Sequence, residues 1–182
     1  ELARAGAVHV GGTRAQLAAA ENAVARGRHA EAPYVLVSQP SVVDPSRAPA
    51  GHHVLWSYAH VPLGSGRDVG EAVQRQLERF APGFSDLVLA RHAVSAFQLA
   101  GDDPTLAGGD IACGATTAWQ LVFRPVPRWD PYRVPLDGVY LCSAATSPGP
   151  GVHGLSGVNA ARRALRQRFG ITVGRDGLSA PR

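Results

Sequence analysis

The sequence predicts an α+β fold, because strand-like and helix-like segments occur together without the steady alternation of a parallel sheet. Compact runs of β-forming residues lie at 34–38 and 53–61. Within 68–80 the apolar residues recur at helical spacing. They are Val69, Val73, Leu77 and Phe80.

The first elements follow from turn and cap signals. Residues 7–10 are short and apolar and end at two glycines, which predicts a strand and a turn. Thr13 is placed to cap a helix over 14–26, a stretch rich in Ala, Leu and Gln. The run Tyr34–Ser38 predicts the next strand.

The middle of the chain contains a proline-rich segment followed by a predicted strand and a predicted helix. Residues 39–51 carry three prolines and predict a loop. Alternation over 53–61 predicts a strand, and the periodic segment 68–80 predicts a helix that ends at Pro82-Gly83. The periodicity of 86–93 fits a strand or a short helix equally, and 99–109 predicts a turn-rich loop.

In the last third, Trp119–Phe123 predicts a strand that prolines stop, and residues 138–143 predict another behind a turn. A glycine-rich segment at 148–154 follows. It leads into a predicted helix over 156–169, which Gly170 closes.

Bulk composition narrows the function classes. Hydrophobic residues make up 45% and charged residues 18%, which suits a packed core. No apolar run approaches the roughly 20 residues of a spanning helix, and no signal peptide is evident. The net charge is +4 and every one of the 18 basic residues is Arg, without interleaved aromatic residues. We therefore expect no nucleic-acid partner and a cytoplasmic protein, with peripheral membrane contact left open.

The four late arginines, the cysteines and the histidines have ordinary interpretations. The arginines predict a solvated helix face or a complement to the helix C-terminal dipole. They are Arg162, Arg163, Arg166 and Arg168. Cys113 and Cys142 lie in no CxxC or Cys/His cluster, which indicates two reduced thiols. His53 and His60 would face opposite sides of a regular strand, so no metal site is predicted.

The segment 139–162 carries the chemistry. A predicted strand runs into a glycine-rich turn that opens a helix, and the first amides of a helix lack internal partners. Glycines allow close backbone approach, so the turn suits a phosphate or an electron-rich group such as a flavin carbonyl. A tight connection with nothing bound is the structural alternative.

A nicotinamide-binding turn is a rival interpretation. Gly149, Gly151 and Gly154 satisfy GxGxxG, and Asp176 lies where a ribose-binding acid is expected. Against this, 144–148 separate the predicted strand from the first glycine, and Pro150 removes a donor from the loop. The chain also ends before further strand–helix units.

The stretch Leu141–Ala161, LCSAATSPGPGVHGLSGVNAA, resembles the C-terminal FAD-contacting segment of phytoene desaturase-like flavoproteins, which group with the amine oxidases in a larger FAD superfamily. Upstream stretches resemble the same family in the same order, so the likeness covers nearly the whole chain. They are 8–12 (VHVGG), 39–51 (QPSVVDPSRAPAG), 78–84 (ERFAPGF) and 108–111 (GGDI).

This resemblance implies the C-terminal part of a two-domain FAD/NAD(P)-binding flavoprotein. Residues 1–136 would belong to a substrate-binding domain with a mixed-sheet floor. Residues 137–170 would supply the last strand, glycine-rich turn and helix of the FAD domain, and 171–182 would be a tail. FAD is the implied cofactor.

The resemblance also implies site residues. Gly151, Val152, His153 and Gly154 would contact the flavin, and Ser143 would lie near the ribityl chain or pyrophosphate. Many relatives in the superfamily carry an acidic residue near the position of Cys142-Ser143. This sequence lacks that residue, which is a departure from the family pattern at the Ser143 position. No catalytic residue is assigned, because the flavin supplies the chemistry.

Two further residues are candidates for the substrate pocket, Asp110 and Trp119. Each has a structural alternative. Asp110 follows two glycines and suits a turn or cap, and Trp119 suits a core.

The resulting hypothesis is an FAD-dependent oxidoreductase that transfers hydride from a small apolar substrate to flavin. The chain begins at Glu1 and contains no Met, so we expect a part of a longer protein, inactive without an N-terminal FAD-binding part. Two alternatives stay open: a non-enzymatic remnant or interaction module, and an NAD(P)-binding protein that uses Gly149, Gly151 and Gly154.

Overall fold

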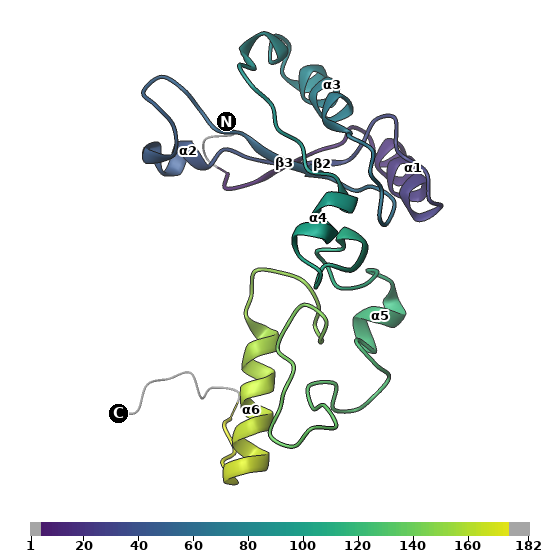
Figure 1. The fold of residues 1–182 in the computed structure, drawn as a ribbon, viewed down its shortest axis with the longest axis vertical. Helices are drawn as coiled ribbons and strands as arrows, with labels where there is room; N and C mark the ends of the chain where they lie inside the picture. The colour runs from purple at the N-terminus through teal and green to yellow at the C-terminus, as the bar shows by residue number, and fades with distance from the viewer. Residues whose placement is uncertain (1–4, 175–182) are drawn as a thin grey trace. The chain divides into compact units, whose positions relative to one another are not determined.

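The computed structural model describes residues 5–174, which divide between two compact units. Unit 1 is Glu1–Gly109 and unit 2 is Asp110–Arg182. The described residues hold helices and one small antiparallel sheet (Figure 1). The domain boundary expected at 136/137 falls inside unit 2. The two-domain flavoprotein arrangement stays a prediction.

Unit 1 is built on a three-stranded antiparallel sheet in the order β1-β2-β3. The strands are β1 (Val8–Val10), β2 (Val35–Ser38) and β3 (Trp56–Ala59). Val10 lies opposite Val35, which in turn lies opposite Ala59. The three predicted strands of this unit are therefore confirmed, with slightly shorter bounds.

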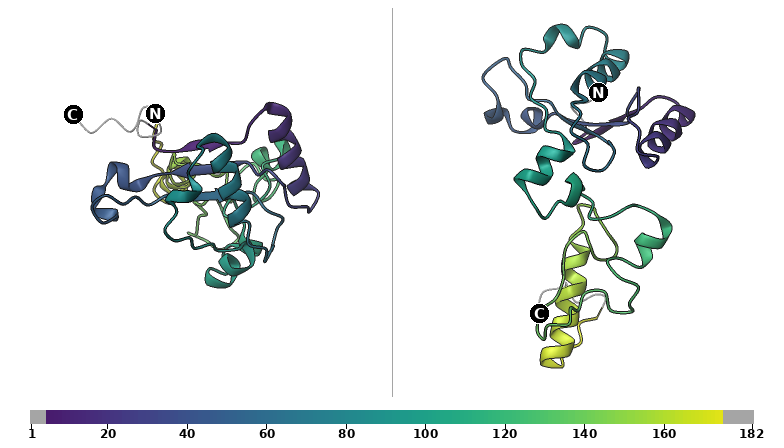
Figure 2. Two further views of the ribbon diagram at one scale, coloured as in Figure 1. Left: turned by 90° about the horizontal axis from the view of Figure 1, so that it is seen from above. Right: turned by 45° about the vertical axis from the view of Figure 1, so that its right-hand side comes forward.

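One face of the sheet makes the core. Val35 and Val37 are buried on alternate positions of β2, as a strand with one covered face requires. Helix α3 (Gly70–Phe80) lies against this face and contributes Leu77 (Figure 2). Other partly buried residues pack around them: Val10, Leu55, Ala59, Val73 and Phe84. The opposite face carries the aromatic pair Trp56 and Tyr58, with ring centroids 5.5 Å apart.

Helix α1 (Arg14–Ala25) begins where the sequence predicts. The Thr13 hydroxyl accepts from the backbone N–H of Gln16, and the Gln16 side chain accepts from the Thr13 N–H. This reciprocal capping satisfies two amides that the helix cannot pair internally.

Several segments predicted as loops contain helix. Within 39–51 the chain forms α2 (Pro40–Val43) and a 3-10 turn, and within 99–109 most of α4 (Ala96–Asp102) and another 3-10 turn are found. Ser95 and Gln98 form a capping box for α4, a signal that the loop assignment overlooked. The ambiguous segment 86–93 is neither strand nor α-helix; after a 3-10 turn at Ser85–Leu87 it has no regular structure.

In unit 2 the strand predicted at Trp119–Phe123 is wrong. These residues lie in helix α5 (Ala118–Val122) and at its C-terminal cap. The Thr117 hydroxyl accepts from the Gln120 N–H and so starts the helix. β-Forming side chains favour a strand only where another strand pairs with them.

The strand predicted at 138–143 is also wrong. Only an isolated bridge, Arg133 with Tyr140, forms there, beside a hydrogen bond from the Leu141 N–H to the Tyr132 carbonyl. The described part of unit 2 contains no strand that could extend this bridge into a sheet. Helix α6 (Leu155–Phe169) is confirmed, and Gly170 in the left-handed conformation ends it.

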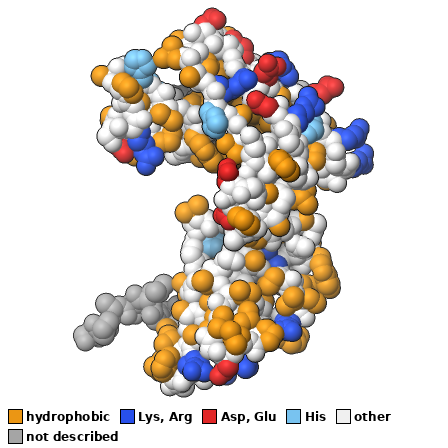
Figure 3. All heavy atoms as spheres, in the orientation of Figure 1, with side chains coloured by type: hydrophobic (Ala, Val, Ile, Leu, Met, Phe, Trp, Pro, Cys, Tyr) orange, Lys and Arg blue, Asp and Glu red, His pale blue; other side chains and the backbone are white. Residues whose placement is uncertain are grey.

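Apolar side chains cover part of the face of unit 2 seen in Figure 3. Many large apolar side chains of this unit are exposed. They include Ile111, Trp119, Val122, Trp129, Leu136, Val152 and Phe169. No helix within the described residues has the length and apolar character that membrane crossing requires.

Candidate functional site

The bend before α6 is exposed. Gly151, Val152, His153 and Gly154 are all exposed, and the Val152 side chain is fully so. Gly151 and Gly154 both have positive φ, +155° and +61°. The four residues that sequence reasoning assigned to the flavin thus form one uncovered bend at the N-terminus of a 15-residue helix.

The amides of this bend are largely without partners. From Gly151 to Gly157, the described residues pair only the Leu155 N–H, which donates to Nδ1 of His153 at 3.0 Å. The His153 ring therefore caps the helix and does not reach away from it. The other N–H groups, including those of Ser156 and Gly157, need water or a ligand as acceptor.

The base of the turn, in contrast, is rigidly held. Thr146 is 0% exposed. Its hydroxyl donates to the Ser143 carbonyl at 2.8 Å, and its carbonyl accepts from the Gly149 N–H at 2.8 Å. The Ser156 hydroxyl of α6 also donates to the Thr146 carbonyl, at 3.4 Å. Helix and turn therefore share one hydrogen-bonded base.

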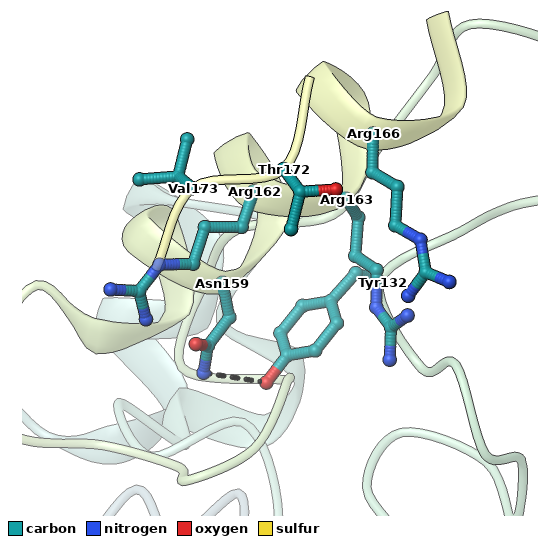
Figure 4. A pocket seen from close by; sticks show the side chains of 7 residues that line it. All are labelled: Tyr132, Asn159, Arg162, Arg163, Arg166, Thr172 and Val173. Atoms are coloured by element: carbon teal, nitrogen blue, oxygen red, sulfur yellow. Dashed lines mark hydrogen bonds between the residues drawn. The ribbon is translucent and has the colours of Figure 1, made fainter. Parts of the chain in front are cut away.

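Tyr132 extends this base. Its hydroxyl donates to the Ser147 carbonyl at 2.8 Å and accepts from the side-chain amide of Asn159 on α6 at 3.0 Å (Figure 4). The Ser147 hydroxyl donates to the Leu121 carbonyl at 3.1 Å, which ties α5 to the same network. Because each partner comes from a different segment, the turn is fixed from several sides.

Ser143 lies at the start of the turn and not at its tip. Its hydroxyl accepts from the Ala145 N–H at 3.1 Å, a local turn contact. The side chain is exposed, and no hydrogen bond joins it to the bend at 151–154. Its predicted proximity to a cofactor stays a prediction.

Asp110 adopts the turn role that was the alternative to substrate binding. Its carboxylate accepts from the N–H groups of Ala112 at 2.8 Å and Gly114 at 2.6 Å. This contact supports a sharp turn in which Cys113, a non-glycine residue, has φ +54°. Both carboxylate oxygens are thus engaged by the chain's own backbone.

Trp119 is not a core residue, because 63% of it is exposed. Its ring packs against Phe123 of the same segment, with centroids 4.3 Å apart. Unit 2 therefore presents an open aromatic surface on α5, and the substrate contact of Trp119 stays a prediction.

Arg124 is a site residue that sequence reasoning missed. It is 2% exposed, and its Nη2 donates to the carbonyls of Ala112 at 2.7 Å and Cys113 at 3.0 Å. On its other side lies Gly149, where a Cβ would fall 2.6 Å from Nη1. The guanidinium thus lies between the 110–114 turn and the glycine-rich turn. A lone Arg among prolines gave no sequence signal of burial.

Arginines of α6 line an open pocket of about 400 Å³, the one drawn in Figure 4. Its walls are Tyr132, Asn159, Arg162, Arg163, Arg166, Thr172 and Val173. Arg163 lies 3.6 Å from Asp130, and Arg162 donates to the Gly174 carbonyl. Arg166 and Arg168 occupy the last turn, where positive charge complements the helix dipole as expected.

No group of three metal-ligating side chains occurs among residues 5–174. His53 contacts the Ser41 hydroxyl at 3.2 Å, and His60 pairs with Glu21 at 2.9 Å. Cys113 and Cys142 are both free and exposed.

The bend fits a flavin in two physical respects. At Gly151 and Gly154 no Cβ blocks close approach to the backbone, and the unpaired amides offer donors to ring carbonyls or to a phosphate. The exposed amides of Gly151 and Gly154 are the groups that would hold it. Asp176, the acid of the rival nicotinamide interpretation, and most of the predicted tail lie outside the described residues.

The chain is similar to part of two curated mammalian proteins. It is 36% identical over 152 residues to "Pyridine nucleotide-disulfide oxidoreductase domain-containing protein 2" of Mus musculus and to the protein of that name from Rattus norvegicus. The alignment covers 77% of this chain and 26% of each relative. The chain thus spans about a quarter of the length of the curated relatives it matches.

No family model matches the chain. No solved structure matches it either.

Proposed function

We propose that the chain is part of an oxidoreductase. The relatives carry that activity class in their name, and their similarity to this chain extends over three quarters of it. Their name refers to pyridine nucleotides and does not mention FAD. The flavin is therefore the finer part of the proposal and rests on the bend.

The proposed cofactor is FAD, and the proposed reaction is hydride transfer from a C–H bond of a small apolar substrate. The observation that carries this is the uncovered bend at 151–154, where a helix N-terminus leaves amides unpaired above a hydrogen-bonded base. A bound flavin would accept the hydride, and the protein would position and shield it.

The chain's own residues would bind and orient. The bend would supply hydrogen-bond donors, and the hydrogen bonds of Thr146 and Tyr132 hold the turn that leads into it. The exposed rings of Trp119 in unit 2 and Trp56 in unit 1 each offer apolar surface. A substrate of isoprenoid-like character would suit such surfaces, since apolar contact area and not charge would hold it.

The test is a flavin-binding titration of the chain joined to whatever sequence precedes Glu1 in its gene, with the chain alone beside it. We expect flavin absorbance to co-elute with the longer protein. We expect Gly154→Ala to weaken binding about tenfold or more, because a Cβ in left-handed backbone distorts the bend.

Gly138→Ala is the matched control. Gly138 also has positive φ, +80°, but it lies in a turn apart from the bend. Both variants should lose similar stability, and only Gly154→Ala should lose flavin. Equal flavin affinity in the two variants would contradict a cofactor at the bend, and a longer protein without flavin would favour the non-enzymatic alternative.

A nicotinamide-binding role is the second candidate, favoured by the name of the relatives. Within the described residues no strand leads directly into the glycine-rich turn, as a dinucleotide-binding turn requires. This candidate would be supported over the first if the chain bound NAD or NADP but no flavin, and if Gly151→Ala abolished that binding.

A further inference from the structure

The buried guanidinium of Arg124 is not explained by the bend alone. Nε and Nη1 have no hydrogen-bond partner among the described residues, and the side chain forms no ion pair there. Burial of an uncompensated cation is costly, so natural chains seldom keep one without a reason.

Its neighbours are two turns, each with a residue at positive φ. Nη2 holds the carbonyls of Ala112 and Cys113, where the non-glycine Cys113 has φ +54°. Nη1 lies against Gly149, where φ is +102° and a side chain would collide with the guanidinium. A planar, multidentate donor can brace two turns at once, which a flexible ammonium cannot do.

Gly149 links this brace to the bend. Its N–H donates to the Thr146 carbonyl, which also accepts from Ser156 on α6. Displacement of Gly149 would therefore change how the glycine-rich turn meets the first turn of α6. Arg124 acts on the bend through this connection and does not touch it directly.

We infer that Arg124 is the positioning residue of the proposed flavin site, bracing the glycine-rich turn and supplying the positive charge that favours electron uptake there. This inference rests on the proposed function. A cation removed from water interacts more strongly with charge that develops nearby than the same cation in solvent. Negative charge gained by a bound electron acceptor would be stabilised accordingly.

The test compares three variants of the longer natural protein. Arg124→Met removes both the charge and the brace, and Arg124→Lys keeps the charge but cannot reach both carbonyls. Arg128→Met is the control: it makes the same charge change four residues along, at an exposed side chain. The measured quantities are the flavin dissociation constant, the flavin midpoint potential, and hydrogen exchange of the Gly149 amide without flavin.

We expect Arg124→Met to weaken flavin binding about tenfold or more, as loss of hydrogen bonds from a charged group implies. It should also lower the midpoint potential. Arg124→Lys should weaken flavin binding but keep the midpoint potential close to that of the wild type. Arg128→Met should change neither the dissociation constant nor the midpoint potential. An unchanged potential in Arg124→Met would overturn the electrostatic part of the inference.

Flavin-free exchange keeps the brace testable if Arg124→Met fails to fold or if the wild-type protein binds no flavin. Faster exchange of the Gly149 amide in Arg124→Lys than in Arg128→Met would support the brace, and equal exchange would overturn it. A wild-type protein without flavin would refute the proposed function, and with it the electrostatic part, but not the brace.

Discussion

The two compact units are stabilised in different ways. In unit 1, buried apolar side chains of β2 and α3 pack around Val35, Val37 and Leu77. In unit 2, the polar side chains of Arg124, Thr146 and Ser156 are buried, and many large apolar side chains are exposed. One unit is a small conventional core, and the other is a hydrogen-bonded frame around a turn and a helix.

The two kinds of stabilisation differ in how precisely they position backbone groups. Apolar packing is non-directional and mainly stabilises, whereas side-chain hydrogen bonds to backbone fix particular carbonyls and amides in place. In unit 2 these bonds hold the base of the glycine-rich turn and leave its tip bare. The tip therefore has exposed amides without partners among the described residues, as the proposed flavin site requires.

The largest expected effect is in unit 1. Leu77→Ala should lower the free energy of unfolding by about 2–5 kcal/mol, because it opens a cavity beside β2. Leu89→Ala is the control, since Leu89 is exposed. Denaturant unfolding with hydrogen exchange would show the loss in residues 5–109. Equal loss of protection in 110–174 would break the comparison, because both units would then unfold as one.

An intermediate effect is expected in unit 2. Tyr132→Phe removes the bonds to Ser147 and Asn159 and should lower the free energy of unfolding by about 1–3 kcal/mol. Tyr140→Phe removes one exposed bond, to Gln167, and should cost less. Urea unfolding followed by exchange at 143–149 is the measurement. Similar losses in both variants would show that the frame is not held by buried polar contacts.

The smallest effect concerns acid. Hydrogen bonds from the Gly83 N–H and then the Ser85 N–H hold the pKa of Glu78 in unit 1 below its ordinary value of 4.5. A depressed pKa contributes stability that is full above the ordinary value and is lost as pH falls through the folded-state value.

Wild-type protein should therefore be more stable than Glu78→Gln near neutral pH, and the gap should narrow as the pH falls below the ordinary value of 4.5. Urea unfolding midpoints from about pH 7 to about pH 3 would test this. A gap that stays constant down to the lowest pH would assign the effect to side-chain shape and not to ionisation.

Local signals in the sequence predicted much of unit 1. Thr13 caps α1 as its position indicates, and the compact run of β-forming residues at 34–38 forms β2. The same reasoning failed at 119–123 and 138–143, where β-forming residues found no strand to pair with. It also missed the capping box of α4.

At the candidate site, the sequence by itself determined the glycine-rich turn and the helix after it, because positive φ and helix termination depend on residue type at single positions. Only the tertiary structure decided that Arg124 is buried between two turns and that His153 caps its own helix. The Arg124 contacts join separate segments of the chain, and no local pattern encodes the orientation of the His153 ring. Burial of a polar group is settled by what packs around it.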